Sequence, residues 1–162
     1  MYFSREKVVR FCASFLCLIS LSACGDMLHK KESAFYAENE TAIERKREIK
    51  KYSFQEQWEI YHYGWTQVDP GPVDMSGAIS QCGEGMLKFI FQKLDKSSDN
   101  TDFLMAIFAF KDMENNKFVN ICENDKYLNK ISGYTVNIQD DYDRDVYATQ
   151  YSTLCKHQST SK

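Results

Sequence analysis

An apolar run that ends at a cysteine, residues 11–24, is the feature that most constrains what this chain can fold into. Three basic residues, Arg5, Lys7 and Arg10, precede the run, against the single acid Glu6. The run has about thirteen apolar or small residues, too few to cross a bilayer, which takes roughly 20. A basic start, a short apolar segment and small residues at its end are the parts of a secretory signal. The folded protein is therefore expected to be built from the chain that follows this segment.

The end of the run, Leu21-Ser22-Ala23-Cys24, resembles the lipobox of bacterial lipoproteins. In that family a diacylglycerol is attached to the cysteine thiol, the signal peptide is cut before the cysteine, and the new amine is acylated. The resemblance implies a lipidated, palmitate-bearing Cys24 and a place in the cell envelope, facing the periplasm. Gly25 follows the cysteine where an Asp would retain an enterobacterial lipoprotein in the inner membrane, so the outer membrane is favoured. The alternative is an ordinary secreted chain.

The chain that follows the signal has the length and charge of one acidic domain. Removing residues 1–23 from the 162 leaves 139, which is enough for one domain. The signal holds three of the 20 basic and one of the 23 acidic residues, so the remainder holds 17 and 22, a net charge of −5. Nucleic-acid binding depends on basic patches, so this charge argues against a nucleic-acid partner. It would suit a basic partner, and it also serves solubility.

The cysteines divide by compartment. Cys12 and Cys17 leave with the signal, and Cys24 is the expected lipidation site. Three thiols then remain in an oxidising space: Cys82, Cys122 and Cys155. They allow three pairings, each of which leaves one thiol over. No two of them form a C-x-x-C pair, so their spacing supports neither a redox motif nor a zinc knuckle.

The first part of the mature chain, residues 24–51, is dense in charge and is expected to be a partly helical tether. Its few apolar residues make no continuous stripe, although residues 42–51 contain good helix formers. Such a tether would reach about 90 Å when extended and about 40 Å as a helix. The globular domain is predicted to span residues 52–155, and residues 156–162 are expected to fray.

The aromatic residues concentrate in residues 52–68, YSFQEQWEIYHYGWTQV. Apolar and polar side chains alternate from Trp58 to Tyr63, which predicts a strand or an extended segment. Its two faces would carry two sets: Trp58, Ile60 and His62 inward, and Tyr61, Tyr63 and Trp65 on the other side. Because Tyr and Trp dominate interface energetics, the second set is the candidate partner-binding surface, with Tyr61 and Tyr63 at least partly exposed. The other interpretation is that the whole segment is core.

Three helices are expected after the prolines at 70 and 72, over residues 74–82, 84–94 and 101–113. Asp74 is the expected N-cap of the first, and Gly83 the residue just past its C-terminus. Residues 103–110 are eight consecutive apolar residues, which fit a helix or a buried strand equally well by periodicity. Thr101 as a cap and the Ala, Leu and Met content favour the helix.

The last part of the chain is predicted to combine a helix with two strands. Apolar residues in 118–128 fall near one helical face, whereas Tyr134–Ile138 alternates as a strand does. A turn at residues 140–143 would return Val146–Tyr151 beside that strand. The predicted fold class is therefore α+β: a small, mainly helical domain with a few strands.

The order of features from Trp65 to Cys122 resembles a group of short proteobacterial Cys-containing lipoproteins of unknown function. The shared pattern is a Trp, a Gly-containing turn, a short helix that ends in the Cys-Gly pair at Cys82, and a later Cys. The resemblance implies a disulfide between Cys82 and Cys122, and it carries no activity. The tail departs from the group, because it has neither a further Cys after Cys155 nor a proline.

The sequence offers no set of residues that predicts catalysis, a metal site or a cofactor. The histidines, His29, His62 and His157, lack ligand spacing. The acids at 141, 143 and 145 match the start of a calcium loop, but Val146 replaces the required Gly, so an acidic turn explains them better. Glu56 and Glu59 are interpreted as solvated charges rather than as an acid–base pair.

These observations predict a protein that is not an enzyme: a binding or inhibitory lipoprotein that recognises another protein, as immunity and exclusion lipoproteins do. This comparison is an analogy of size, charge and anchoring. The alternative is a structural accessory lipoprotein of an envelope or secretion assembly. The membrane, through the lipid anchor, and one protein of unknown identity are the expected partners.

Overall fold

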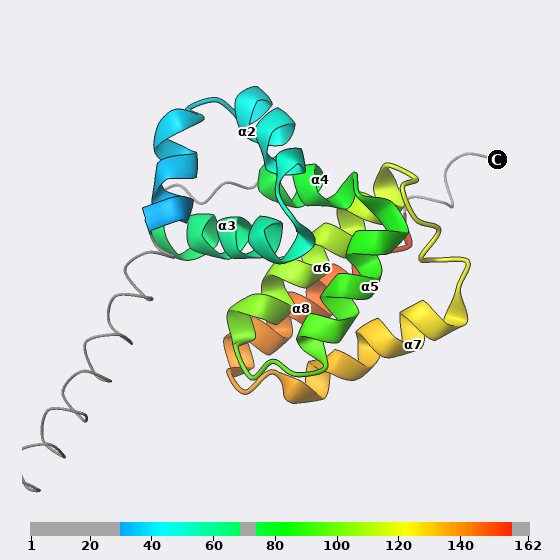
Figure 1. The fold of residues 1–162 in the computed structure, drawn as a ribbon. Coiled ribbons are helices and arrows are strands. Elements are labelled where there is room, and N and C mark those ends of the chain that lie inside the picture. Colours follow the sequence, from blue (N-terminus) through cyan, green and yellow to red (C-terminus); the bar gives the residue numbers. More distant parts are fainter. Residues whose placement is uncertain (1–29, 69–73, 157–162) are drawn as a thin grey trace, which may run out of the picture.

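An apolar helix, α6 (Asn100–Asn115), runs through the middle of the computed structural model, which describes residues 30–68 and 74–156 (Figure 1). The expectation of a helix rather than a buried strand over residues 101–113 is confirmed. Its N-cap is Asp99, whose side chain accepts a hydrogen bond from the Thr101 N–H, and not Thr101 itself. Because residues 103–110 offer no polar face, neighbouring helices have to cover most of its surface.

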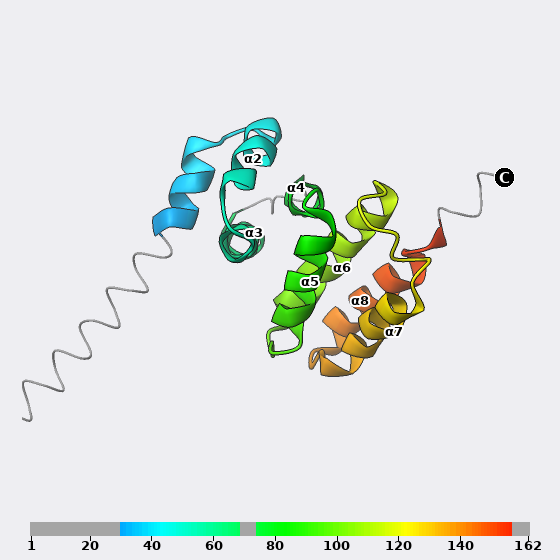
Figure 2. The same cartoon turned by 45° about the vertical axis from the view of Figure 1, so that its right-hand side comes forward.

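The helices form three groups that follow chain order, as Figure 2 shows, and α6 belongs to the middle one. The first group consists of helix 30–38, α2 (Ala42–Glu48), the 3₁₀ turn η1 (Ile49–Lys51) and α3 (Phe54–Gln67). The second consists of α4 (Asp74–Ser80), α5 (Gly83–Leu94) and α6. The third consists of α7 (Asp125–Gly133), the 3₁₀ turn η2 (Tyr134–Asn137) and α8 (Asp141–Thr153). The expected helices over 74–82 and 84–94 correspond to α4 and α5.

The prediction of an α+β fold is wrong, because the part of the chain that the structure describes contains helices and no strand. The aromatic segment predicted as a strand is α3. Ser53 begins this helix with a capping box: its hydroxyl accepts from the Glu56 N–H, and the Glu56 carboxylate accepts from the Ser53 N–H. This reciprocal pair satisfies two N–H groups at the helix start and outweighs the short alternation of side chains.

The helical turn of α3 redistributes the aromatic side chains between core and surface. Trp58, Ile60 and Tyr61 are all buried, whereas His62 and Tyr63 are half-buried. The expectation that Tyr61 is exposed and His62 packed inward is therefore wrong. Residues three apart share one face of a helix, so Tyr61 follows Trp58 into the core.

The two predicted C-terminal strands are also helical. Tyr134–Ile138 contains η2, and residues 146–151 lie within α8. Asp140 caps α8 by accepting from the Asp143 N–H. The acidic cluster that was interpreted as a turn between strands thus forms the first turn of a helix, where negative charge is favoured by the helix dipole.

A buried carboxylate organises the loop between α6 and α7, where residues 118–128 were expected to share a helical face. Glu114 is 2% exposed and accepts hydrogen bonds from the Cys122 N–H and the Lys117 ammonium. Lys117 has a φ of 59°, a strained value for a residue with a side chain. The prediction of a helix from residue 118 is therefore wrong for residues 118–124, which belong to this loop, and α7 begins at Asp125.

The described part of the predicted tether, residues 30–51, packs on the body. Phe35 and Ile49 are 1% and 0% exposed and belong to the same core as α3 and α6. The lipobox at Leu21–Cys24 and the tail after Lys156 lie outside the described residues. Within the ranges that the structure describes, no helix has the length and apolar content needed to cross a membrane.

The disulfide joins Cys122 to Cys155, so the pairing of Cys82 with Cys122 is wrong. The bond ties the α6–α7 loop to the end of α8, 33 residues later. In the chain-entropy model, closing a loop of this length raises the free energy of the unfolded chain by about 4 kcal/mol. Cys82 is a free thiol at the junction of α4 and α5, and its sulfur donates to Gln57 Oε1 on α3.

The helical assignment of α3 predicts unequal effects for two neighbouring tyrosines. Tyr61→Ala should lower the free energy of unfolding by about 3–5 kcal/mol, because a fully buried aromatic side chain is lost. Tyr63→Ala should lower it by about 1 kcal/mol, the range typical of half-exposed positions. Urea denaturation of both variants is the measurement. Equal losses would place both side chains on one face, as in a strand, and would contradict α3.

Candidate functional site: a cleft between α3 and α6

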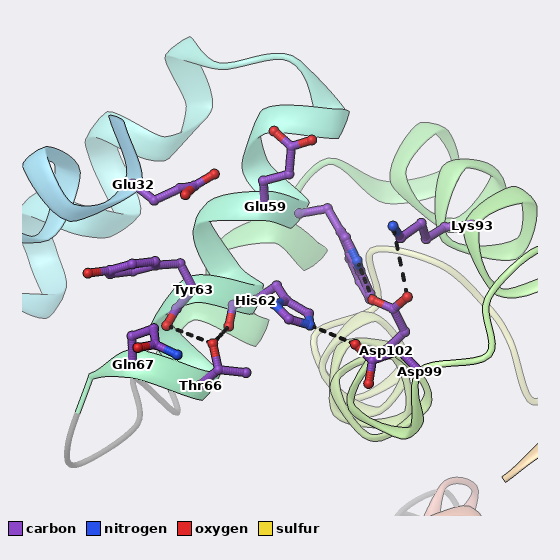
Figure 3. Close-up of a pocket in the computed structure, with 10 residues that line it drawn as sticks. Glu32, Glu59, His62, Tyr63, Thr66, Gln67, Lys93, Asp99 and Asp102 are labelled. Carbon is purple, nitrogen blue, oxygen red and sulfur yellow. Dashed lines mark hydrogen bonds and ion pairs between the residues drawn. The ribbon is translucent and has the colours of Figure 1, made fainter. Parts of the chain in front are cut away.

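The candidate site is a cleft of about 480 Å³ where the N-terminal group of helices meets the start of α6; we call it the α3–α6 cleft. Figure 3 shows how its side chains lie. Most of the lining comes from one face of α3, and the rest from helix 30–38, α5 and the first turn of α6. The lining residues are Glu32, Trp58, Glu59, His62, Tyr63, Thr66, Gln67, Lys93, Asp99 and Asp102.

His62 and Asp99 connect the two walls of the cleft. His62 Nε2 on α3 lies 3.1 Å from Asp99 Oδ2 at the cap of α6. Partial burial opposes ionisation of Asp99, but hydrogen bonds from the Thr101 N–H and from His62 together lower the pKa of its carboxyl. Asp99 therefore carries its negative charge at neutral pH and holds the imidazole ring in one orientation.

Asp102 anchors the floor of the cleft. Its side chain is almost fully buried, and Asp102 Oδ1 accepts from the Trp58 indole N–H at 2.9 Å. Asp102 Oδ2 accepts from the Ser97 hydroxyl at 2.5 Å, and Lys93 Nζ lies 3.9 Å away. A buried carboxylate is tolerated when donors surround it in this way. The arrangement fixes the indole plane that forms the apolar base of the cleft.

Helix 30–38 forms the outer wall. The Tyr36 hydroxyl donates to the Ile60 carbonyl at 3.0 Å, and the Tyr36 ring stacks on Tyr63 with centroids 6.0 Å apart. Lys31 forms an ion pair with Glu56 near the start of α3. Glu32, on the same helix, is 5% exposed and turns its carboxylate toward α3 in Figure 3. Residues once expected to form a tether are thus part of the site.

The chemistry of the lining favours binding of a cation. Four carboxylates, on Glu32, Glu59, Asp99 and Asp102, face one lysine and one histidine, and the rings of Trp58 and Tyr63 lie among them. Carboxylates and aromatic faces both attract ammonium and guanidinium groups. The Thr66 hydroxyl already donates to the His62 carbonyl at 2.9 Å, so it is engaged with its own helix. Among the described residues, no three His, Cys, Asp or Glu side chains are placed so that they could hold a metal ion.

The predicted partner-binding residues lie in different environments in the structure. Tyr63 lines the cleft, as a surface role requires. Tyr61 is 0% exposed, and its hydroxyl reaches the Met105 carbonyl in the core. Trp65 is half-buried against Phe108, outside the lining. Cys24 lies outside the described residues.

Sequence reasoning missed most of the lining, above all Glu32, Lys93, Asp99 and Asp102. His62 and Asp99 are 37 positions apart, and Trp58 and Asp102 are 44 apart. No local motif joins residues at such separations, and tertiary packing alone brings them together. The available signal was the S-x-x-E capping box, which would have identified α3 as a helix and placed its polar face.

A second hollow, of about 460 Å³, lies beside the α6–α7 loop. The Tyr127 hydroxyl donates to Glu84 at its edge. Partial burial and then this contact raise the pKa of Tyr127. Its lining is more polar and lacks the buried indole and the paired carboxylates of the α3–α6 cleft, which is the stronger candidate.

Comparison with known proteins gives no match to this chain among protein-family models, curated proteins or solved structures.

The contact between Lys31 and Glu56 predicts a pH dependence of stability. The Lys31 ammonium, then the Ser53 N–H and hydroxyl, lower the pKa of Glu56 to about 2. A carboxyl whose pKa is lower in the folded state stabilises the fold above its ordinary pKa, and this contribution is lost as the pH falls toward 2. Between pH 5 and pH 3, the urea midpoint of the wild type should therefore fall further than that of Glu56→Gln. Lys31→Met should flatten the profile in the same way, and parallel profiles would contradict the contact.

Proposed function

We propose that this chain is a lipid-anchored protein of the bacterial cell envelope whose folded domain binds another protein through the α3–α6 cleft. In this role it acts without catalysis, as a binding or inhibitory module in the manner of immunity and exclusion lipoproteins. The comparison with those proteins rests on analogy of size and anchoring. The proposal depends on two independent features, the cleft and the N-terminal sequence.

The cleft is the observation that carries the proposal. Protein interfaces concentrate their energy in a few pockets with aromatic walls and buried polar anchors. Trp58 is held in place by Asp102 at 2.9 Å, and Tyr63 by its stacking on Tyr36, so neither ring has to be ordered on binding. Pre-organised side chains of this kind reduce the entropic cost of association.

The orientation of the charged groups also supports binding. Asp99 and Asp102 accept hydrogen bonds from residues of their own chain, which holds their charge in fixed positions at the cleft. Fixed charges of one sign select a partner of the other sign and speed its approach. The net charge of −5 that remains after residue 23, from the counts in the sequence, acts in the same direction.

The anchor is supported by the sequence that precedes the domain. A basic start, a short apolar run and Leu21-Ser22-Ala23-Cys24 occur in the order that a lipoprotein signal requires. Two or three acyl chains would hold the protein in a bilayer, because each buried methylene contributes about 0.8 kcal/mol.

The proposal is tested in cells with a photo-crosslinking amino acid at Gln67, an exposed residue of the cleft lining. A discrete crosslinked protein should form there and should be lost when Glu59→Lys reverses a charge of the lining. Labelling with palmitate should mark the wild type and should be absent from Cys24→Ser.

The matched control places the crosslinker at Thr149, which is exposed on α8, and the charge reversal at Asp145 on the same helix. Neither change should affect the crosslink at Gln67. Equal crosslinks at Thr149, or a crosslink at Gln67 that survives Glu59→Lys, would reject the cleft as the binding site. Palmitate labelling of Cys24→Ser would reject the anchor.

A further inference from the structure

The docking of helix 30–38 on α3 leaves a short connection between the lipidation site and the folded domain. Only residues 25–29 separate Cys24 from Lys30, the first described residue. Six residue steps span at most about 20 Å, whatever their conformation. If residues 24–51 were an extended tether, the domain could lie up to about 90 Å from Cys24.

The connection cannot lengthen by releasing helix 30–38, because this helix is held at several points to α3 and to Tyr52, just before it. Phe35 is 1% exposed, and its ring meets Tyr52 at a centroid distance of 5.8 Å. The Tyr36 hydroxyl bonds to the Ile60 carbonyl, and Lys31 pairs with Glu56. Detaching the helix would expose the Phe35 ring and break these contacts together.

The α3–α6 cleft begins at this same helix. Glu32, one of its lining residues, lies two helical positions after Lys30, which adds about 3 Å. The outer wall of the cleft is therefore within about 25 Å of the acylated cysteine at the bilayer surface. A partner that reaches the cleft has to do so close to the membrane.

The charges of the lining define what part of the partner would enter. Figure 3 shows Glu32 on helix 30–38 with its carboxylate pointing toward α3, which carries Glu59 and, one turn later, Tyr63. A guanidinium or ammonium group placed beside Glu59 gains its carboxylate and the aromatic face of Tyr63, four residues further along α3. A carboxylate or phosphate would meet repulsion from four acids, with Lys93 and His62 alone to offset it.

We infer that the occupant of the α3–α6 cleft is a basic side chain, lysine or arginine, presented by a protein embedded in the same membrane close to the bilayer surface. This inference rests on the proposed function, since it assumes lipidation at Cys24 and binding at the cleft. To the proposed function it adds where the partner is and what it presents. The partner is a membrane protein rather than a freely diffusing one, and it presents a cationic side chain to the cleft.

The inference is tested with the lipidated protein in nanodiscs, labelled with 5-fluorotryptophan. The chain has two tryptophans, and Trp65→Phe assigns the fluorine signal of Trp58 at the base of the cleft. The probe is a synthetic transmembrane peptide that carries one arginine a few residues beyond its apolar span. The Trp58 signal should shift on titration, and the same peptide with citrulline in place of arginine should give no shift.

Confinement to one bilayer is tested by comparison with the extramembrane part of the peptide alone. The membrane-embedded peptide should bind at least tenfold more tightly, because it shares the disc with the protein. Inserting fifteen Gly/Ser residues after Asp26 lengthens the connection about 3.5-fold, which should weaken apparent binding by up to about sixfold. The same fifteen residues appended after Lys162 are the matched control and should have no effect.

A neutral variant of Glu59 tests the contribution of its charge to binding, independently of whether the partner shares the membrane. Glu59→Gln should weaken binding of the arginine peptide about fivefold or more, whereas Asp145→Asn, on α8, should leave it unchanged. Equal affinity for the embedded and the soluble peptide, or an insertion after Asp26 without effect, would overturn the membrane partner. A citrulline peptide that binds as well as the arginine peptide would overturn the basic side chain.

These outcomes differ from failure of the proposed function. If Cys24 is not labelled by palmitate, or no crosslink forms at Gln67, then the anchor or the binding site itself is rejected. If both are present and the nanodisc titrations fail, the protein binds a partner through the cleft, but that partner is not a basic group of the same membrane.

Discussion

The burial of α6 is the constraint on which the rest of this structure depends. Its eight consecutive apolar residues, 103–110, leave it without a polar face, so α3, α4, α5 and α8 all pack against it. These four helices have seven to fourteen residues each, lengths that are marginal in isolation. They are stable because each buries its apolar face on α6 or on a neighbour. Both ends of α6 carry carboxylates with structural roles, Asp99 as the N-cap and the buried Glu114 near the C-terminus.

The cleft forms where the neighbouring helices cover the start of α6. There α3 crosses beside Asp99 and Asp102, and the polar face of α3 is left open above the buried indole of Trp58. Helix 30–38 closes the far side by packing Phe35 and Tyr36 on the body. One packing event therefore supplies a wall of the candidate site and shortens the connection to Cys24. The proposed binding role and the proposed closeness to the bilayer both depend on it.

The parts of the fold that could be predicted were those in which apolar spacing and length agree. The helix over 84–94 could be predicted from the helical spacing of its apolar residues, and the helix over 101–113 from its polar start and its Ala, Leu and Met content. The positive φ of Gly83, 59°, matches the predicted helix end. The predicted strands failed because five or six alternating residues were given more weight than the caps at Ser53 and Asp140, which start α3 and α8. The disulfide and the lining of the cleft could not be predicted, because Cys122 with Cys155, and His62 with Asp99, meet only through tertiary packing.

Amide hydrogen exchange of helix 30–38 tests the central claim most directly. If this helix is part of the folded domain, the amides around Phe35 and Asn39 should exchange slowly, with protection close to that of α3. Protection should fall in both helices together when Phe35→Ala removes the buried ring. Exchange at the rate of an unfolded chain in residues 30–38, with α3 still protected, would show that the segment is a free tether. The wall of the cleft and its closeness to the membrane would then both be wrong.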